Sequence, residues 1–199
     1  MEQEEALEQI KLIRNTMQKA SHKFFFSPWQ WIEWGVVIIL GGILTHWLLA
    51  IGDTTHISTV WIGAFIIGGT LEGVAWLLDA QRRGIALFSP FTFKILGLLV
   101  CYLIPGFLMT PVFVQLGLAS HLIGYWLINM SSVIVALVLL GERKDYLVMG
   151  AQLLVCGLLS VSIFVEQALH IGVASFGVGG LVFGIYLLVK EKQDQKSEV

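Results

Sequence analysis

The chain has 199 residues, of which 56% are hydrophobic and only 13% are charged, and its formal net charge is −2. Soluble domains carry about 25% charged residues, and the mean hydropathy here is +0.81, so the composition excludes an ordinary soluble domain. The two cysteines, Cys101 and Cys156, both fall in apolar segments, so no disulfide framework is implied.

The first 30 residues combine a charged, periodic segment with a cluster of tryptophans. An a/d-type apolar stripe runs through Ala6, Ile10, Ile13, Met17, Ala20 and Phe24, which predicts an amphipathic helix. That helix either lies on the cytoplasmic interface or offers residues 6–24 to a protein partner or a second copy. Ser27 and Pro28 should end it, and Trp29, Trp31 and Trp34 are expected to anchor the chain at the bilayer interface.

Apolar segments long enough to cross a bilayer recur six times, which predicts an all-α, polytopic membrane protein. The expected spans are 31–51, 58–78, 91–116, 121–140, 146–165 and 171–189. A six-helix transmembrane bundle thus occupies 31–189, and 190–199 form a charged tail. The connections are short, so neighbouring spans should be antiparallel hairpins.

The positive charges decide the predicted orientation. All 12 Lys and Arg residues lie on one side of the predicted topology: Lys11, Arg14, Lys19, Lys23, Arg82, Arg83, Lys94, Arg143, Lys144, Lys190, Lys192 and Lys196. The alternate connections contain none. The positive-inside rule therefore predicts that both termini and the tail are cytoplasmic.

Residues 10–26, IKLIRNTMQKASHKFFF, resemble the IRxTMExAxxF opening of a family of small bacterial integral membrane proteins. The similarity continues through 76–90, 125–137 and 177–190. The resemblance implies an amphipathic N-terminal helix, about six spans and the bacterial inner membrane. Activity is not established for that family, so the resemblance implies no chemistry.

One carboxylate lies well inside a predicted span. Glu72 falls within 58–78, and a charge at the centre of a span costs roughly 2.5–3.5 kcal/mol on insertion scales. Four polar residues could meet it there: Thr70, Asn129, Ser131 and Gln152. The group forms either a proton- or ion-coupled polar site or an interhelical hydrogen-bonded clasp.

Two further patterns lie in the spans. Pro105, Gly106 and Pro111 should kink or unwind the third span, and interrupted helices often line transport sites. Paired glycines at Gly69 and Gly73, and at Gly180 and Gly184, allow close helix approach, either within the bundle or in a homodimer.

Four histidines and two carboxylates fall on the predicted outer face: His46, His56, His121, His170, Asp53 and Glu166. Such residues can bind a metal or sense external pH. Their spacing does not draw them together, however. A bis-histidine haem needs facing histidines in two spans, and His46 has no evident mate.

No nucleophile motif, phosphate-binding loop, Cys/His zinc pattern or nucleic-acid signature is present, so an enzyme is unsupported, nucleic acid is not an expected partner and no cofactor is indicated. The leading hypothesis is a non-catalytic bilayer protein that acts through protein contacts, as an accessory, scaffold or sensory subunit. The alternative is a small-solute or ion- or proton-coupled carrier or channel using Glu72 and the proline-broken span. A weaker alternative is an outer-face metal or haem site.

Overall fold

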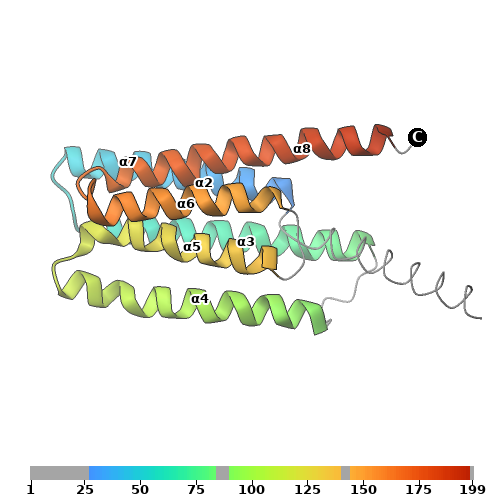
Figure 1. Ribbon diagram of the computed structural model, residues 1–199. Helices are drawn as coiled ribbons and strands as arrows, with labels where there is room; N and C mark the ends of the chain where they lie inside the picture. Colours follow the sequence, from blue (N-terminus) through green and yellow to red (C-terminus); the bar gives the residue numbers. More distant parts are fainter. Residues whose placement is uncertain (1–26, 84–89, 140–143, 198–199) are drawn as a thin grey trace, which may run out of the picture.

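The computed structural model describes residues 27–83, 90–139 and 144–197. Within these ranges the regular structure is entirely helical, and six helices are long and apolar enough to cross a membrane, as predicted (Figure 1). The amphipathic helix predicted over 6–24 lies outside the described residues.

The first three spans are single helices, α2 (Pro28–Ala50), α3 (Ile57–Arg83) and α4 (Pro90–Gln115). A short 3₁₀ turn, η1 (Ala119–His121), leads into α5 (Leu122–Leu139), and α6 (Asp145–Ser162) follows. The last span joins three pieces: α7 (Ala168–Gly172), the π-helix η2 (Val173–Val178) and α8 (Gly179–Ser197).

Local signals account for where several helices begin and end. Pro28 occupies the first turn of α2, where its missing N–H is not needed, and the Ser27 backbone N–H donates to Gln30 Oε1 at 2.6 Å. Gly52 and Gly117 follow α2 and α4 with φ of +78° and +72°, a left-handed conformation that favours glycine.

Successive long helices run antiparallel, so their connections gather at two ends of the bundle (Figure 1). The end that contains Ser27, the start of α4, the start of α6 and the last turns of α8 is called the terminal end. The end formed by the turns 51–56, 116–121 and 163–167 is called the histidine end. An ion pair between Lys190 and Asp145, at 2.8 Å, joins α8 to α6 near the terminal end.

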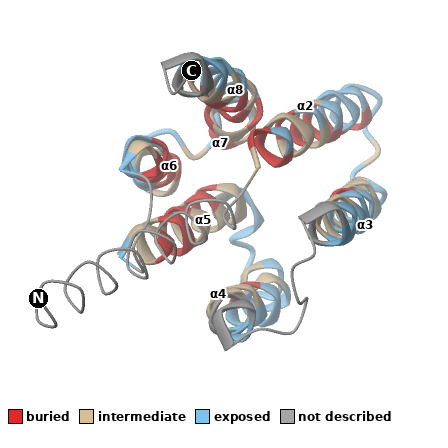
Figure 2. Cartoon of the chain, turned by 90° about the vertical axis from the view of Figure 1, so that its right-hand side faces the viewer, coloured by how far each residue is buried: buried red, intermediate tan, exposed pale blue. Residues whose placement is uncertain are grey.

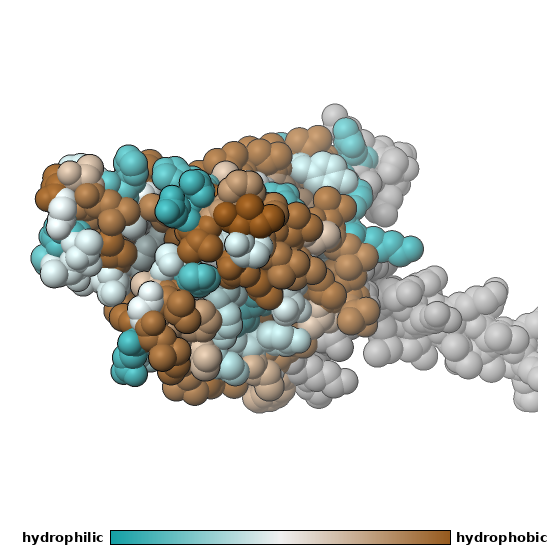
Figure 3. All heavy atoms as spheres, turned by 60° about the vertical axis from the view of Figure 1, so that its left-hand side comes forward, coloured by the Kyte–Doolittle hydropathy of each residue, from teal (hydrophilic) through white to brown (hydrophobic). Residues whose placement is uncertain are grey.

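Figure 2 shows the order of the helices around the bundle. α2 packs against both α8 and α3, while α5 packs against both α6 and α4. The main core lies among α2, α5, α6 and α8, and its buried members are Trp31, Leu127, Ile134, Tyr146, Met149, Leu153 and Leu187. The surface visible in Figure 3 is mostly hydrophobic, which suits a lipid environment.

Of the three predicted interfacial tryptophans, Trp31 is buried inside the bundle and Trp34 is half-buried. Trp31 is only 5% exposed, and its ring lies 5.2 Å from that of Phe183 and 6.0 Å from that of Tyr146. Trp34 turns toward α3, as described below. Only Trp29, at 64% exposed, has the accessibility that an interfacial anchor needs. The burial of Trp31 by helix packing argues against an anchoring role for its ring, whereas the anchor role of Trp34 stays a prediction.

Candidate functional site: a carboxyl pair between α2 and α3

Glu72 meets α2 rather than the polar residues of the later spans. The Trp34 indole Nε1–H donates to Glu72 Oε2 at 2.8 Å. Glu33, the residue before Trp34, belongs to the same turn of α2. Its Oε1 atom is buried and accepts no hydrogen bond among the described residues. The contact between α2 and α3 therefore joins Glu72 to one N–H donor, and a second acidic group, Glu33, lies on the same turn of α2 as that donor.

The antiparallel hairpin places both carboxyl groups at the same depth. Glu33 is five residues after the start of α2, which corresponds to about 7–8 Å along a helix that rises 1.5 Å per residue. Glu72 lies six residues before the end of the apolar segment Ile57–Leu78 and eleven residues before the end of α3 itself. Both groups are thus inside the spans, in the third of the bundle nearest the terminal end.

Gly68 makes room for Trp34. A Cβ atom added at Gly68 would approach the Trp34 ring to 2.9 Å, so a larger residue there would displace the indole. The absent side chain lets the indole lie flat against α3, one turn from Glu72. Glycine at this position thus explains how an α2 tryptophan reaches a carboxylate on α3.

The pair has a definite chemical consequence. Trp34 can stabilise one negative charge by hydrogen bonding, but it offers only one N–H. Two neighbouring carboxylates away from bulk water cannot both remain charged without a counter-charge. A proton on one of the two groups, or a cation bound near them, would supply that charge.

The other four residues predicted to join Glu72 do not converge on it. Each side chain donates instead to a backbone carbonyl: Thr70 to Ile66 at 2.6 Å, Asn129 to Tyr102 at 3.0 Å, Ser131 to Gly150 at 2.7 Å and Gln152 to Ser175 at 3.2 Å. Hydroxyl and amide groups within an apolar span need hydrogen-bond partners, and a nearby backbone carbonyl supplies one in each case. The predicted five-residue polar site is therefore not formed.

The proline-rich span, which was predicted to kink or unwind, is not unwound. α4 is continuous from Pro90 to Gln115 through both Pro105 and Pro111. Helix α5 supports this region, because Asn129 donates to the Tyr102 carbonyl and Trp126 Nε1–H donates to Thr110 Oγ1 at 3.3 Å. A Cβ at Gly106 would come within 2.8 Å of Asn129 Nδ2, so Gly106 allows this close approach.

The irregular span is the sixth, where the π-helix η2 widens the turn. Gln152 of α6 donates to the Ser175 carbonyl within it. Gly179 leaves space for that amide, since a Cβ there would lie 2.7 Å from Gln152 Nε2. π-Helical turns frequently occur at functional sites. In this span the sequence analysis singles out only Gly180 and Gly184, as a packing pair, and no signal in the sequence indicates the π-helix.

An aromatic cluster joins the carboxyl pair to the other helices. Phe65 of α3 lies 5.9 Å from the Trp34 ring, 5.5 Å from Phe107 of α4 and 5.4 Å from Trp126 of α5. Phe107 and Trp126 are themselves 5.0 Å apart. These four residues, the aromatic cluster, close the seam between α3 and the α4–α5 pair.

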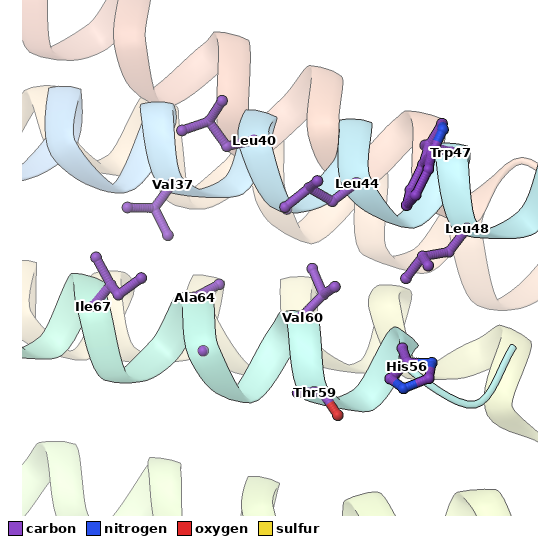
Figure 4. Close-up of a pocket in the computed structure, with 12 residues that line it drawn as sticks. Val37, Leu40, Leu44, Trp47, Leu48, His56, Thr59, Val60, Ala64 and Ile67 are labelled. Carbon is purple, nitrogen blue, oxygen red and sulfur yellow. The ribbon is translucent and has the colours of Figure 1, made fainter. Parts of the chain in front are cut away.

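An apolar groove of about 440 Å³ continues along the same α2–α3 contact toward the histidine end. Figure 4 shows Val60, Ala64 and Ile67 of α3 projecting toward α2. His56 and Thr59 are the polar residues that line it. The groove thus runs from the histidine end to within one residue of Gly68, where Trp34 packs. It contributes apolar surface rather than reacting groups.

The four predicted outer-face histidines lie at one end, but they form separate contacts. His56 Nδ1 is 2.7 Å from Asp53 Oδ2, and His121 Nδ1 is 3.2 Å from Ser120 Oγ. His46 does have a mate, contrary to expectation: its ring centroid lies 5.8 Å from that of His170. Glu166 is exposed in the turn before α7. Across the described part of the chain no cluster of three or more metal-ligating side chains forms.

The two glycine pairs have different surroundings. Cβ atoms at Gly180 and Gly184 would lie 3.4 Å from the Trp31 carbonyl oxygen and 2.7 Å from the Pro28 carbonyl oxygen, so both glycines lie at the α2–α8 contact. At Gly69 and Gly73 an added Cβ would meet nothing within 4 Å. The α3 pair therefore makes no close helix contact within the described chain.

Sequence reasoning missed Glu33 because it falls among the predicted interfacial tryptophans. The sequence did contain a signal for Glu33. In an antiparallel hairpin, a carboxylate early in the first helix lies at a depth similar to that of a carboxylate late in the second. Comparison with known proteins finds no matching family model, no matching curated protein and no matching solved structure. The family resemblance drawn from residues 10–26 therefore stays a prediction.

Proposed function

We propose that the chain is an ion- or proton-coupled membrane carrier whose cation-binding site is the carboxyl pair Glu33–Glu72. The single observation that carries the proposal is the presence of two acidic groups on the facing helices α2 and α3, inside the spans, with Glu72 hydrogen-bonded to Trp34 and with Glu33 Oε1 buried and without a donor among the described residues. Intramembrane ionisable groups in pairs often mark proton or ion pathways. This is the carrier alternative of the sequence analysis, with Glu33 added and the proline-broken span removed.

The surroundings of the pair suit reversible binding. Trp34 stabilises one carboxylate, and the incoming cation or proton compensates the second charge. Release of the cation or proton restores the electrostatic repulsion between the carboxylates on α2 and α3. Because α3 contacts the other helices chiefly through α2 and the aromatic cluster, a change of charge at this contact acts on a sparsely packed helix.

The proposed orientation has both termini in the cytoplasm of the bacterial inner membrane. The 12 Lys and Arg residues support the orientation, and the resemblance supports the membrane. In this orientation Glu33 and Glu72 lie in the cytoplasmic third of the bilayer, and the apolar groove lies toward the outer face.

The proposal is tested in proteoliposomes that enclose a pH-sensitive dye and carry an imposed membrane potential. Wild type is compared with Glu33→Gln and Glu72→Gln, and Glu166→Gln is the control because Glu166 is exposed at the histidine end. Both site variants should lower flux at least about tenfold, since an amide neither exchanges a proton nor neutralises a cation. Repeating the measurement with Na⁺, K⁺ or neither inside separates cation movement from proton movement.

A binding measurement covers the case in which flux needs an additional substrate. Infrared difference spectra recorded on changing pH or cation should contain carboxyl bands that disappear in Glu72→Gln and in Glu33→Gln. Trp34→Phe should shift the remaining bands because it removes the hydrogen bond to Glu72. Equal flux and equal difference spectra in wild type and both glutamine variants would contradict the proposal.

A second candidate, a non-catalytic accessory protein that acts through protein contacts, is favoured by one observation. Only 11% of the span residues in α3 and 6% of those in α4 are buried within the chain. In this version these two helices, together with residues 6–24, supply the surface for a partner or a second copy. The glycine variants in the Discussion distinguish it from the carrier.

A further inference from the structure

A pair of imidazoles lies at the histidine end, away from the carboxyl pair. His46 belongs to the last turns of α2 and His170 to α7, so the pair joins segments far apart in the sequence. Their ring centroids are 5.8 Å apart and their planes are inclined at 69°. Both residues are exposed, so the ring edges are open to solutes from the aqueous side.

Close packing of the two helices creates this pair. Gly42 lies one turn before His46 on α2, and an added Cβ there would clash with Val173, which lies three residues after His170. Side chains three or four residues apart share one face of a helix. The missing side chain at Gly42 therefore brings the backbones together where the imidazoles on both sides face each other.

The separation of the rings suits a shared metal ion. A metal bound to a ring nitrogen at 2.0–2.1 Å lies about 3.2 Å from the ring centroid. Two imidazoles on one ion therefore have centroids about 5.2 Å apart at a tetrahedral angle and about 6.4 Å apart when linear. The observed 5.8 Å lies between these limits.

The donor set defines the class of ion. Imidazole nitrogen suits Cu²⁺ and Zn²⁺, and Cu²⁺ binds most tightly among the divalent first-row ions. We propose that His46 and His170 together bind one divalent transition-metal ion, with water completing its coordination. The observed separation corresponds to an angle of about 130° between the two metal–nitrogen bonds, which a Zn²⁺ site or a distorted Cu²⁺ site can accept. The site is independent of the Glu33–Glu72 pair.

His56 is the principal rival ligand at the same end. Its Nδ1 is already engaged by Asp53, and Thr55 Oγ1 also donates to that carboxylate at 2.7 Å. A carboxylate–imidazole couple can itself bind a metal weakly, so His56 must be separated from the proposed pair. His121, which contacts only Ser120 among the described side chains, is a second control.

The experiment titrates the full-length protein in mild detergent with Cu²⁺ and follows it by electron paramagnetic resonance. Wild type should bind one ion per chain, with nitrogen couplings from two imidazoles. His46→Gln and His170→Gln should each weaken binding at least about tenfold and leave one imidazole on the metal. His56→Gln and His121→Gln should retain both the affinity and the two-imidazole spectrum.

Thermal unfolding with Zn²⁺ guards against variants that merely misfold. Zn²⁺ should raise the melting temperature of wild type and of His56→Gln, because an ion that binds only the folded state stabilises it. Zn²⁺ should not change the melting temperature of His46→Gln or of His170→Gln. Without metal, both variants should melt at nearly the same temperature as wild type. Unaltered Cu²⁺ affinity in the His46 and His170 variants, or equal loss in the His56 variant, overturns the proposal.

Discussion

The two parts of the bundle differ in how completely their helices are covered. α5 packs along α6 and α2 along α8 and the π-helix, while α3 rests mainly on α2 and α4 mainly on α5. Within the spans, 39% of the residues from η1 through α5 are buried, compared with 11% in α3 and 6% in α4. The difference separates a packed core from two peripheral helices.

Glycine distribution gives the physical reason. Gly124 of α5 and Gly157 of α6 face each other: a Cβ at either would come within 2.8–3.0 Å of the other's carbonyl oxygen. Gly69 of α3 and Gly97 of α4 face open space. Because lipid is as apolar as a leucine side chain, close backbone approach and polar contacts decide which helices pack together in a membrane.

The largest effect that tests this difference comes from matched leucine truncations. Leu153 in α6 is 0% exposed and Leu108 in α4 is 66% exposed. Leu153→Ala should lower the free energy of unfolding by about 2–4 kcal/mol, because it leaves a cavity. Leu108→Ala should change it by less than about 0.5 kcal/mol, because lipid or detergent fills the space. Reversible unfolding in mixed detergents measures both.

The stability of the Leu108 variant reports on what covers α4. If Leu108→Ala costs as much as Leu153→Ala, α4 is covered by something other than lipid in the preparation. Cross-linking of the same sample would then identify a second copy or another protein on α4.

A smaller effect on the free energy of unfolding is expected from adding one methyl group to a glycine. One such glycine lies in the packed core and the other in a peripheral helix. Gly124→Ala should destabilise by about 1–3 kcal/mol, because the new Cβ meets the Gly157 carbonyl and Ser160. Gly69→Ala should be neutral or stabilising by up to about 1 kcal/mol, since alanine favours the helix and meets nothing. The same unfolding measurement, with the native mass of each variant, tests this.

Gly69→Ala also separates the two proposed functions. In the carrier, Gly69 faces lipid, so the variant should keep both its mass and its flux. In the accessory protein that uses α3, the added methyl groups should weaken a helix–helix contact and lower the mass of the extracted particle. A Gly69 variant that dissociates a complex would favour the second candidate.

Hydropathy predicted the number of spans because each crossing needs about 20 apolar residues. It could not predict which spans are central. α4 is more apolar than α6 yet far less buried, because the lipid-facing and protein-facing surfaces of a span are equally apolar. The predicted bounds of the last span also gave no indication of its π-helix. Within that π-helix, the Ser175 carbonyl accepts a hydrogen bond from Gln152 of α6, a tertiary contact that the sequence does not reveal.

The candidate site was predictable only in part. Glu72 stood out because a carboxylate is rare within an apolar span. Its partners could not be predicted from polarity: Asn129 and Gln152 need hydrogen bonds, but many carbonyls can accept them, and tertiary packing selects which. Glu33 drew no attention in the sequence, and Trp34 was predicted to lie at the interface, although Trp34 is level with Glu72 and donates to it.

The smallest effect concerns the turn that holds peripheral α3 to α2. Hydrogen bonds from Thr55 and His56 lower the pKa of the Asp53 carboxyl to about 2 from its ordinary 3.8. A lowered pKa in the folded state means that this group stabilises the fold above pH 3.8 and that the contribution is lost as the pH falls toward 2. Asp53→Asn should therefore melt slightly below wild type at pH 6, and the gap should narrow at about pH 3.

Thr55→Val is the matched variant, because it removes the hydroxyl that donates to Asp53 while keeping the carboxylate. It should reproduce part of the pH 6 difference and raise the pKa of Asp53, which can be followed by the chemical shift of a labelled aspartate. A gap between wild type and Asp53→Asn that stays constant with pH would mean that the turn contributes through its backbone shape. The attachment of α3 would then depend on the Trp34 and Phe65 contacts rather than on charge at the turn.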